Sequence, residues 1–175
     1  MDGGRLELPR SAGEVFEGIR ARIFSGWEEG ALETPPNQLS SLLKMSRDRS
    51  VITCGPSVRN FHHDPSLPAV IRDDGARFDF QLILTKRSRS AVSVLAYDYE
   101  LRFPAGSSPP FVRFDLNPPS HDNDDAGLRS HVHVGSNDDG MAAPAPYLTP
   151  DEAIDLMIFG LRRTGRQRHV RAPAE

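Results

Sequence analysis

The sequence predicts an α+β domain in which an antiparallel meander of about four strands lies between N-terminal helices and a C-terminal helix. Apolar residues recur at helical spacing near both ends of the chain, whereas the middle alternates apolar with polar residues and is rich in β-branched and aromatic side chains. A chain of 175 residues can bury one core but is short for two full domains. We expect an N-terminal helical region at 1–70, a sheet domain at 71–163 and a basic, disordered tail at 164–175.

The first helix is expected to begin after Ser11. Ser11 and Glu14 have the spacing of a capping box, in which two backbone N–H groups receive side-chain oxygens. Apolar residues follow at helical spacing, namely Val15, Phe16, Ile19, Ile23, Phe24 and Trp27. Gly26 and Gly30 indicate where this helix ends. A shorter helix is expected in "TPPNQLSSLLKMSRD", with one apolar side made by Leu39, Leu42, Leu43 and Met45.

The strands are expected from the region that follows Arg72. The segments "RFDFQLILTK", "AVSVLAYDYELRF", "FVRFDL" and "RSHVHVG" have the composition and alternation of strands. "RSRS" joins the first two, and "PAGSSPP" joins the second to the third. Both connections are too short for a parallel crossover, so the meander should be antiparallel.

The closing helix is expected in "TPDEAIDLMIFGLRR". Thr149 is a good N-cap, Pro150 suits the first helical position, and Glu152 completes a second capping box. The buried stripe of this helix is expected to contain Ile154, Met157, Ile158 and Leu161.

Composition limits the classes of partner and compartment. The formal net charge of −3 and the sequence pI near 6.1 give no overall attraction to nucleic acid, so such binding would need a local basic patch. Cys54 is the single cysteine, which excludes an internal disulfide framework and a Cys-based zinc knuckle within one chain. The first ten residues lack the pattern of a signal peptide, and no apolar run approaches about 18 residues. We expect a cytoplasmic protein without a membrane contact.

The residues with the clearest chemistry lie on two expected strands. His131 and His133 are two apart in "SHVHVG", so both side chains should point to one face of the sheet. Arg113 and Asp115 should share a face of "FVRFD" for the same reason. A cluster of two histidines, an arginine and an aspartate is therefore expected. An acidic loop beside it carries His121, Asp122, Asp124 and Asp125.

Three kinds of chemistry fit this cluster. In a metal-independent ribonuclease, His131 and His133 would exchange protons while Arg113 or Arg129 holds the phosphate. In a metal site, the two imidazoles and a third histidine, His121, or a carboxylate would ligate zinc or iron. In the third interpretation the side chains only form hydrogen bonds at a sheet edge or an interface. The residues by themselves favour this third interpretation. The ribonuclease interpretation, which needs neither a metal nor another cofactor, is favoured narrowly only when the family resemblance described below is added.

Other polar residues are assigned to the surface or to phosphate contacts. His62 and His63 are adjacent, so in a strand their side chains would diverge, and a polar loop is the better interpretation. Nucleic-acid contacts are expected from basic side chains at the first strand connection and before the last strand, namely Lys86, Arg87, Arg89 and Arg129.

The ordered set of these elements resembles the TumE family of small toxin-antitoxin proteins. It consists of "YDYELRF", "VRFDLNPPSH", "SHVHVG", "APYLT" and "PDEAIDLMIFGL", and covers about residues 77–163. The resemblance implies a compact RelE-like domain that acts on RNA as a toxin and is held in check by a cognate protein partner. The matching residues are Arg113, Asp115, His131, His133 and Gly135. The acidic insertion "SHDNDDAGLR" and the net charge depart from that pattern.

Two functions follow as expectations. The first is a toxin-like ribonuclease of a toxin-antitoxin or defence system, with Arg113, Asp115, His131 and His133 as catalytic residues. The second is a non-catalytic structural or regulatory subunit of a multiprotein antiviral or toxin-antitoxin complex. Trp27 and Phe24 exceed what a small sheet must bury, so a homo-oligomer or partner interface through the N-terminal helices is a further expectation.

Overall fold

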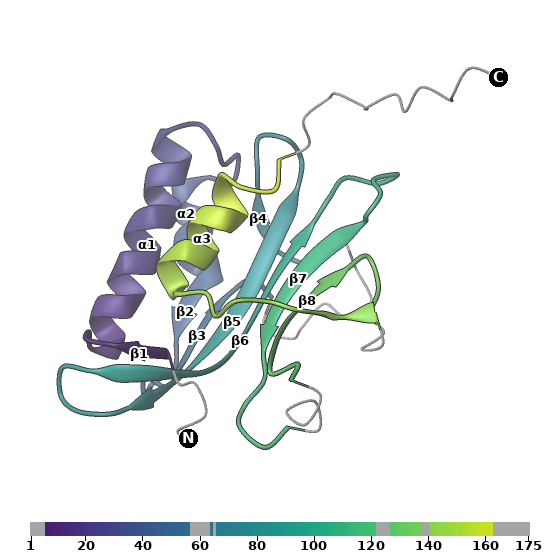
Figure 1. The fold of residues 1–175 in the computed structure, drawn as a ribbon. Coiled ribbons are helices and arrows are strands. Elements are labelled where there is room, and N and C mark those ends of the chain that lie inside the picture. The colour runs from purple at the N-terminus through teal and green to yellow at the C-terminus, as the bar shows by residue number, and fades with distance from the viewer. Residues whose placement is uncertain (1–5, 57–63, 65, 122–126, 138–140, 163–175) are drawn as a thin grey trace.

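The chain folds as an α+β protein with three helices and a nine-stranded sheet in the part that can be described (Figure 1). The computed structural model describes residues 6–56, 64, 66–121, 127–137 and 141–162. The strands follow the order β2-β3-β5-β6-β7-β8-β9, with β1 paired to β6 and β4 paired to β5. All of these pairings are antiparallel. The predicted α+β class with an antiparallel sheet is confirmed.

The four predicted strands form the centre and one side of this sheet. They are β5 (Arg77–Lys86), β6 (Val92–Arg102), β7 (Phe111–Leu116) and β8 (Ser130–Val134). The expected count of about four is not confirmed, because the sheet contains five further strands: β1 (Leu6–Leu8), β2 (Leu43–Met45), β3 (Val51–Cys54), β4 (Val70–Ile71) and β9 (Ala143–Pro144). Each of these has only two to four residues, too few for alternation to stand out in the sequence.

The capping boxes predicted for the two longer helices are both present. Before α1 (Ala12–Glu28), Ser11 Oγ accepts from the Glu14 backbone N–H at 3.3 Å, and the Glu14 carboxylate accepts from the Ser11 N–H at 2.7 Å. Before α3 (Pro150–Ile158), the same exchange joins Thr149 and Glu152 at 3.2 and 2.8 Å. Both helices therefore begin where the sequence predicts.

Two details of the N-terminal helices differ from the prediction. The second helix, α2 (Pro36–Leu42), is shorter than expected, because Leu43 and Met45 belong to β2. Pairing of β2 with β3 outweighs the helical spacing of these two residues. Gly26 lies inside α1 and does not end it. A Cβ atom there would lie 2.8 Å from a methyl carbon of Ile158, so the glycine permits the close approach of α3.

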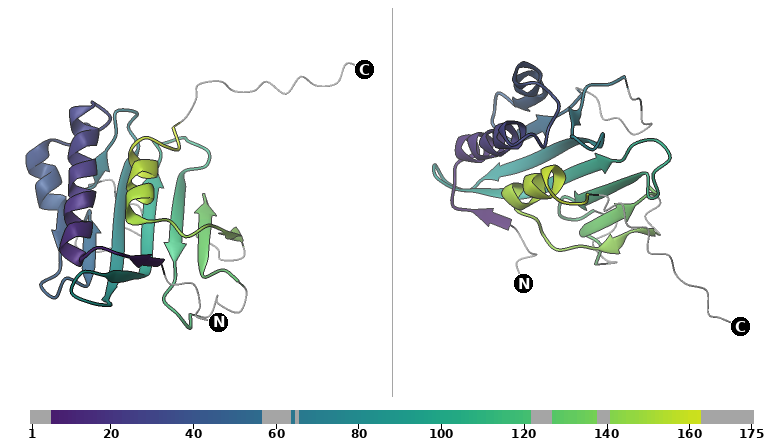
Figure 2. Two further views of the ribbon diagram at one scale, coloured as in Figure 1. Left: turned by 60° about the vertical axis from the view of Figure 1, so that its left-hand side comes forward. Right: turned by 90° about the horizontal axis from the view of Figure 1, so that it is seen from above.

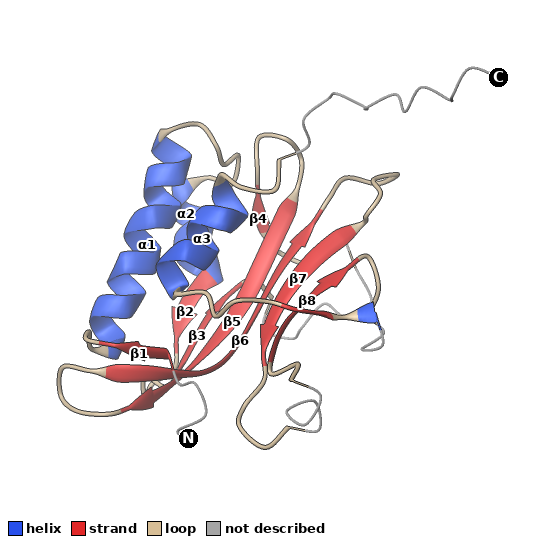
Figure 3. Ribbon diagram, in the orientation of Figure 1, coloured by secondary structure: helices blue, strands red, loops and turns tan. Residues whose placement is uncertain are grey.

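The helices pack together over one face of the sheet (Figures 2 and 3). The side chains of β5 alternate between the two faces of the sheet, and every second residue from Phe78 to Leu84 is buried. This gives the sheet an apolar face that the helices cover. The core combines apolar side chains of all three helices with those of the central strands, including Val15, Ile19, Ile23, Leu39, Phe78, Leu82, Tyr99, Ile154 and Met157. The described part of the N-terminal region thus shares one hydrophobic core with the later strands. The expected tail at 164–175 lies outside the described residues.

Arg72 is a fully buried cation that fixes the end of α3. Its Nη1 donates to the carbonyl oxygens of Met157 and Gly160, both at 2.9 Å, and its Nη2 pairs with the Asp74 carboxylate. The last carbonyls of a helix have no intrahelical partner, so a buried arginine satisfies groups that would otherwise be costly. The guanidinium also lowers the pKa of Asp74 against the opposing effect of partial burial.

Replacing Arg72→Met should lower the free energy of unfolding by about 3 kcal/mol, because the buried Met157 carbonyl, the partly buried Gly160 carbonyl and the Asp74 carboxylate all lose this donor. Urea denaturation followed by circular dichroism measures this change. Arg20→Met is the matched control, since Arg20 is half exposed, pairs with Glu17 at the surface and lies over the ring of Phe24, which a methionine can still cover; it should change the stability by less than about 0.5 kcal/mol. Equal stabilities of the two variants would show that Arg72 is not a structural cap.

Cys54 should be unreactive in the folded protein. It is buried on β3, and burial raises the pKa of its thiol well above the ordinary value, with a smaller contribution from Asp79. Because the thiolate is the reactive form, a disulfide reagent such as DTNB should modify Cys54 only at the rate of unfolding. In guanidinium chloride one thiol per chain should react at once. Fast modification of the native protein would contradict the burial of this side chain.

Candidate metal centre

The site is formed by the pairing of β7 with β8 on the face of the sheet opposite the helices. In this antiparallel pair Asp115 is opposite His131, and Arg113 is opposite His133. Residues directly opposite each other share a face, so four functional side chains are brought together by backbone register alone. The prediction that the two histidines share a face with Arg113 and Asp115 is confirmed.

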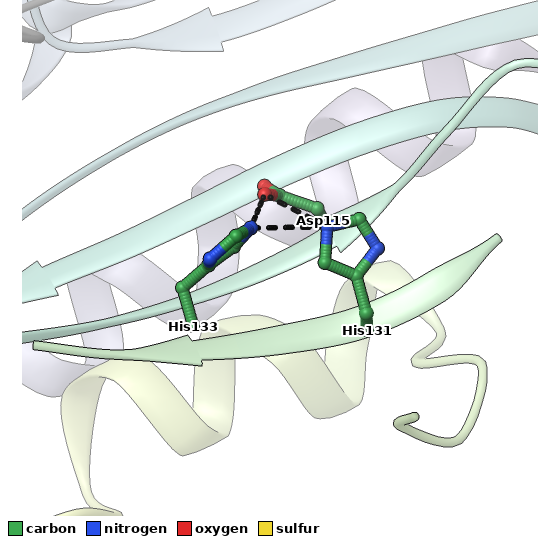
Figure 4. Close-up of side chains that lie close together, drawn as sticks. All are labelled: Asp115, His131 and His133. Atoms are coloured by element: carbon green, nitrogen blue, oxygen red, sulfur yellow. Dashed lines mark hydrogen bonds and ion pairs between the residues drawn. The ribbon is translucent and has the colours of Figure 1, made fainter. Parts of the chain in front are cut away.

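Three of these side chains point their donor atoms at one another (Figure 4). The Nε2 atoms of His131 and His133 are 3.1 Å apart. Asp115 Oδ2 lies 3.6 Å from Nε2 of His131 and 3.4 Å from Nε2 of His133. The three residues are buried, with 2%, 1% and 8% of the surface of His131, His133 and Asp115 exposed. They form a compact set of two nitrogens and one oxygen.

The hydrogen bond of His131 fixes its tautomer. Its Nδ1 lies 2.7 Å from the carbonyl oxygen of Leu128. A carbonyl oxygen only accepts, so Nδ1 must carry a proton, and in the neutral ring Nε2 then carries a lone pair. This bond also orients the ring, as a backbone carbonyl does for many metal-bound histidines. His131 is therefore prepared to donate electrons at the point where the three side chains meet.

Arg113 holds the carboxylate of Asp115 in place and is itself oriented by Asn137. Arg113 Nε donates to Asp115 Oδ2 at 2.7 Å, and its Nη1 donates to Asn137 Oδ1 at 2.8 Å. Glu100 lies 3.9 Å from the same Nη1 and pairs with Arg102 at 2.5 Å. This network compensates the buried negative charge. Sequence reasoning did not single out Asn137, because nothing in "VGSND" indicates that its loop returns to β7.

The geometry of the three donor atoms fits a divalent ion. A triangle with edges of 3.1, 3.4 and 3.6 Å has a common point about 2 Å from each corner, which matches zinc–nitrogen and zinc–oxygen bonds of about 2.0–2.2 Å. Asp115 Oδ1 is also buried and has no hydrogen-bond partner among the described residues. Both observations suit a carboxylate that shares its charge with a cation at this point.

A pocket of about 390 Å³ opens beside the cluster. Arg113 and Asp115 line it together with polar side chains of β5 and β6 and of the segment after β7, namely Gln81, Asp98, Asn117 and His121. His121 belongs to this pocket and does not join the three donor atoms; its Nδ1 lies 3.3 Å from Asn117 Nδ2. The pocket leads to the cluster from the side of Asp115.

The other predicted residues lie elsewhere or outside the described part of the chain. Lys86 and Arg89 line a separate pocket of about 290 Å³ with Arg49, near the start of α1. Arg87 pairs with Glu7 at 3.4 Å, and Arg129 donates to the Asn117 carbonyl at 3.2 Å. Lys86, Arg87 and Arg89 thus lie apart from the histidines, whereas Arg129 contacts Asn117, which lines the pocket beside the cluster. His62, His63, Asp122, Asp124 and Asp125 lie outside the described residues.

Comparisons with known proteins add no family to this geometry. No family model matches the chain, and neither the curated proteins nor the solved structures contain a match. The resemblance to the TumE family therefore stays a prediction. Within the described ranges no helix has the length and apolar character needed to cross a membrane.

Proposed function

We propose that this protein binds one divalent transition-metal ion, zinc or iron(II), through His131, His133 and Asp115. The observation that carries the proposal is the convergence of three donor atoms at mutual distances of 3.1–3.6 Å. In a tetrahedral site with bonds of about 2.05 Å, neighbouring ligand atoms are separated by about 3.3 Å. The spacing of the side chains therefore supports an ion without rearrangement of the sheet.

The donor types support a transition metal over calcium or magnesium. Calcium and magnesium take oxygen ligands, whereas two imidazoles and a carboxylate are suited to zinc and iron. The ion would lie between the two Nε2 atoms and Asp115 Oδ2, and its charge would compensate the buried Asp115 carboxylate. Three protein ligands leave at least one position open, and an ion with an open position supplies Lewis-acid chemistry.

Titration of the metal-free protein with zinc should give one bound ion per chain, measured by calorimetry and elemental analysis. His131→Ala and His133→Ala should each weaken binding more than about 100-fold, since each removes a ligand and not only its support. At a free zinc concentration 100 times Kd, the free energy of unfolding should rise by about 2.7 kcal/mol.

His121→Ala is the matched control for this titration. It removes a histidine from the adjacent pocket and leaves the three donor atoms intact, so zinc affinity should not change. Circular dichroism of each variant excludes unfolding as the cause of any loss. A wild-type protein that binds no divalent ion, or histidine variants that bind as tightly as the wild type, would overturn the proposal.

A second candidate function is the metal-independent ribonuclease of a toxin-antitoxin or defence system, with a RelE-like domain. It is favoured by one observation, namely that two histidines whose ring nitrogens are 3.1 Å apart lie beside an arginine. Burial weighs against it, because RNA would have to reach imidazoles of which only 1–2% is exposed. The carboxylates of Asp98 and Asp115 beside Arg113 also repel phosphate.

The two candidates give opposite results with RNA. On the metal proposal, protein in excess EDTA should leave labelled single-stranded RNA intact on a denaturing gel. Cleavage in EDTA that is abolished in the His131→Ala/His133→Ala double variant, with the fold retained, would replace the metal proposal by the ribonuclease. Cleavage that persists in the double variant would identify a contaminating nuclease.

A further inference from the structure

The pocket beside the cluster has a shape and lining that suit a small ligand. Its volume of about 390 Å³ lies within the range of about 300–1,000 Å³ that is typical of metabolite sites. Ile83, Ala96, Leu116 and Pro118 provide apolar walls, and Arg113 and Asp115 connect the pocket to the three donor atoms. A ligand in this pocket would therefore touch the ion and the guanidinium of Arg113 at once.

Arg113 has donors left for such a ligand. Its Nε and Nη1 contact Asp115, Asn137 and Glu100, whereas Nη2 makes no hydrogen bond or ion pair among the described residues. A guanidinium held on one side by a carboxylate and an amide is pre-organised, so little entropy is lost when its remaining N–H groups bind an oxygen.

The net charge of the pocket with a metal ion bound determines whether it favours an anion or a cation. Arg113 carries one positive charge, and Asp98 and Asp115 carry two negative charges. A divalent ion adds two positive charges and reverses the local balance. The loaded pocket is then positive, which favours an anion, whereas the metal-free pocket disfavours one.

We propose that the pocket binds the oxyanion group of a small molecule, a carboxylate or a phosphate monoester, between the metal ion and Arg113. This inference rests on the proposed metal site. One oxygen of the anion occupies the open coordination position of the ion, and another accepts from Nη2 of Arg113. Residues of β5 and β6 form one wall of the pocket, and its volume of about 390 Å³ suits a small molecule.

The test uses the full chain loaded with cobalt(II), whose visible absorption bands respond to each change of ligand. Acetate, as the carboxylate, and inorganic phosphate are titrated separately into the loaded protein. At least one of them should shift the bands and saturate, and the arm that saturates identifies the oxyanion. Elemental analysis after dialysis verifies that cobalt stays on the protein.

Variants of the pocket show whether the anion enters there. Ala96→Phe and Ile83→Trp should each retain one cobalt ion per chain and weaken anion binding at least about tenfold, because their side chains fill the pocket. Thr85→Trp is the matched control on β5, outside the pocket, and should bind the anion like the wild type. Arg113→Lys should weaken anion binding by about tenfold or more in the cobalt-saturated protein.

The failure of this inference can be distinguished from failure of the metal site. If the protein binds no cobalt, the metal proposal fails, and the oxyanion site fails with it. If one cobalt binds but neither anion alters the bands, or if both pocket-filling variants bind the anion like the wild type, the metal site stands and the oxyanion site is overturned.

Discussion

The pleat of the sheet is the constraint on which both the core and the candidate site depend. Each strand places successive side chains on opposite faces, and in β5 to β8 this separates an apolar face under the helices from a charged face. Registers across four strands align Gln81, Asp98, Asp115 and His131 in one row. A shift of one residue in any pairing would send the histidines into the hydrophobic core.

Burial of so many charged groups on one face requires that they compensate one another. Arg113 supports Asp115, and Glu100 lies between Arg102 and Arg113. Together these pairs fix the side chains in defined orientations at a cost in desolvation. Such a pre-organised arrangement is of greater use for holding a ligand than for stability, because apolar residues would stabilise the same face at lower cost.

Features that depend on residues close together in the sequence could be predicted. Capping boxes at Ser11 and Thr149 and the shared face of His131 and His133 follow from local spacing, and each is present. The strand β2 could not be predicted, because its residues have helical spacing and only the pairing with β3 decides their conformation. Asn137 and the 3.1 Å distance between the imidazoles depend on tertiary packing, which no local pattern encodes. The expected domain boundary near residue 70 stays a prediction.

Because β8 lies near the edge of the sheet, a bound ion would affect how easily this edge opens. In the described part of the chain, the sheet continues beyond β8 with β9 alone, a strand of two residues, so β8 depends mainly on β7 for its hydrogen bonds. Edge elements of this kind open locally at a lower free energy than central strands. Because the donor atoms come from both β7 and β8, a bound ion would crosslink the two strands. Separation of β8 from β7 would then require release of the ion, so the two processes would be coupled.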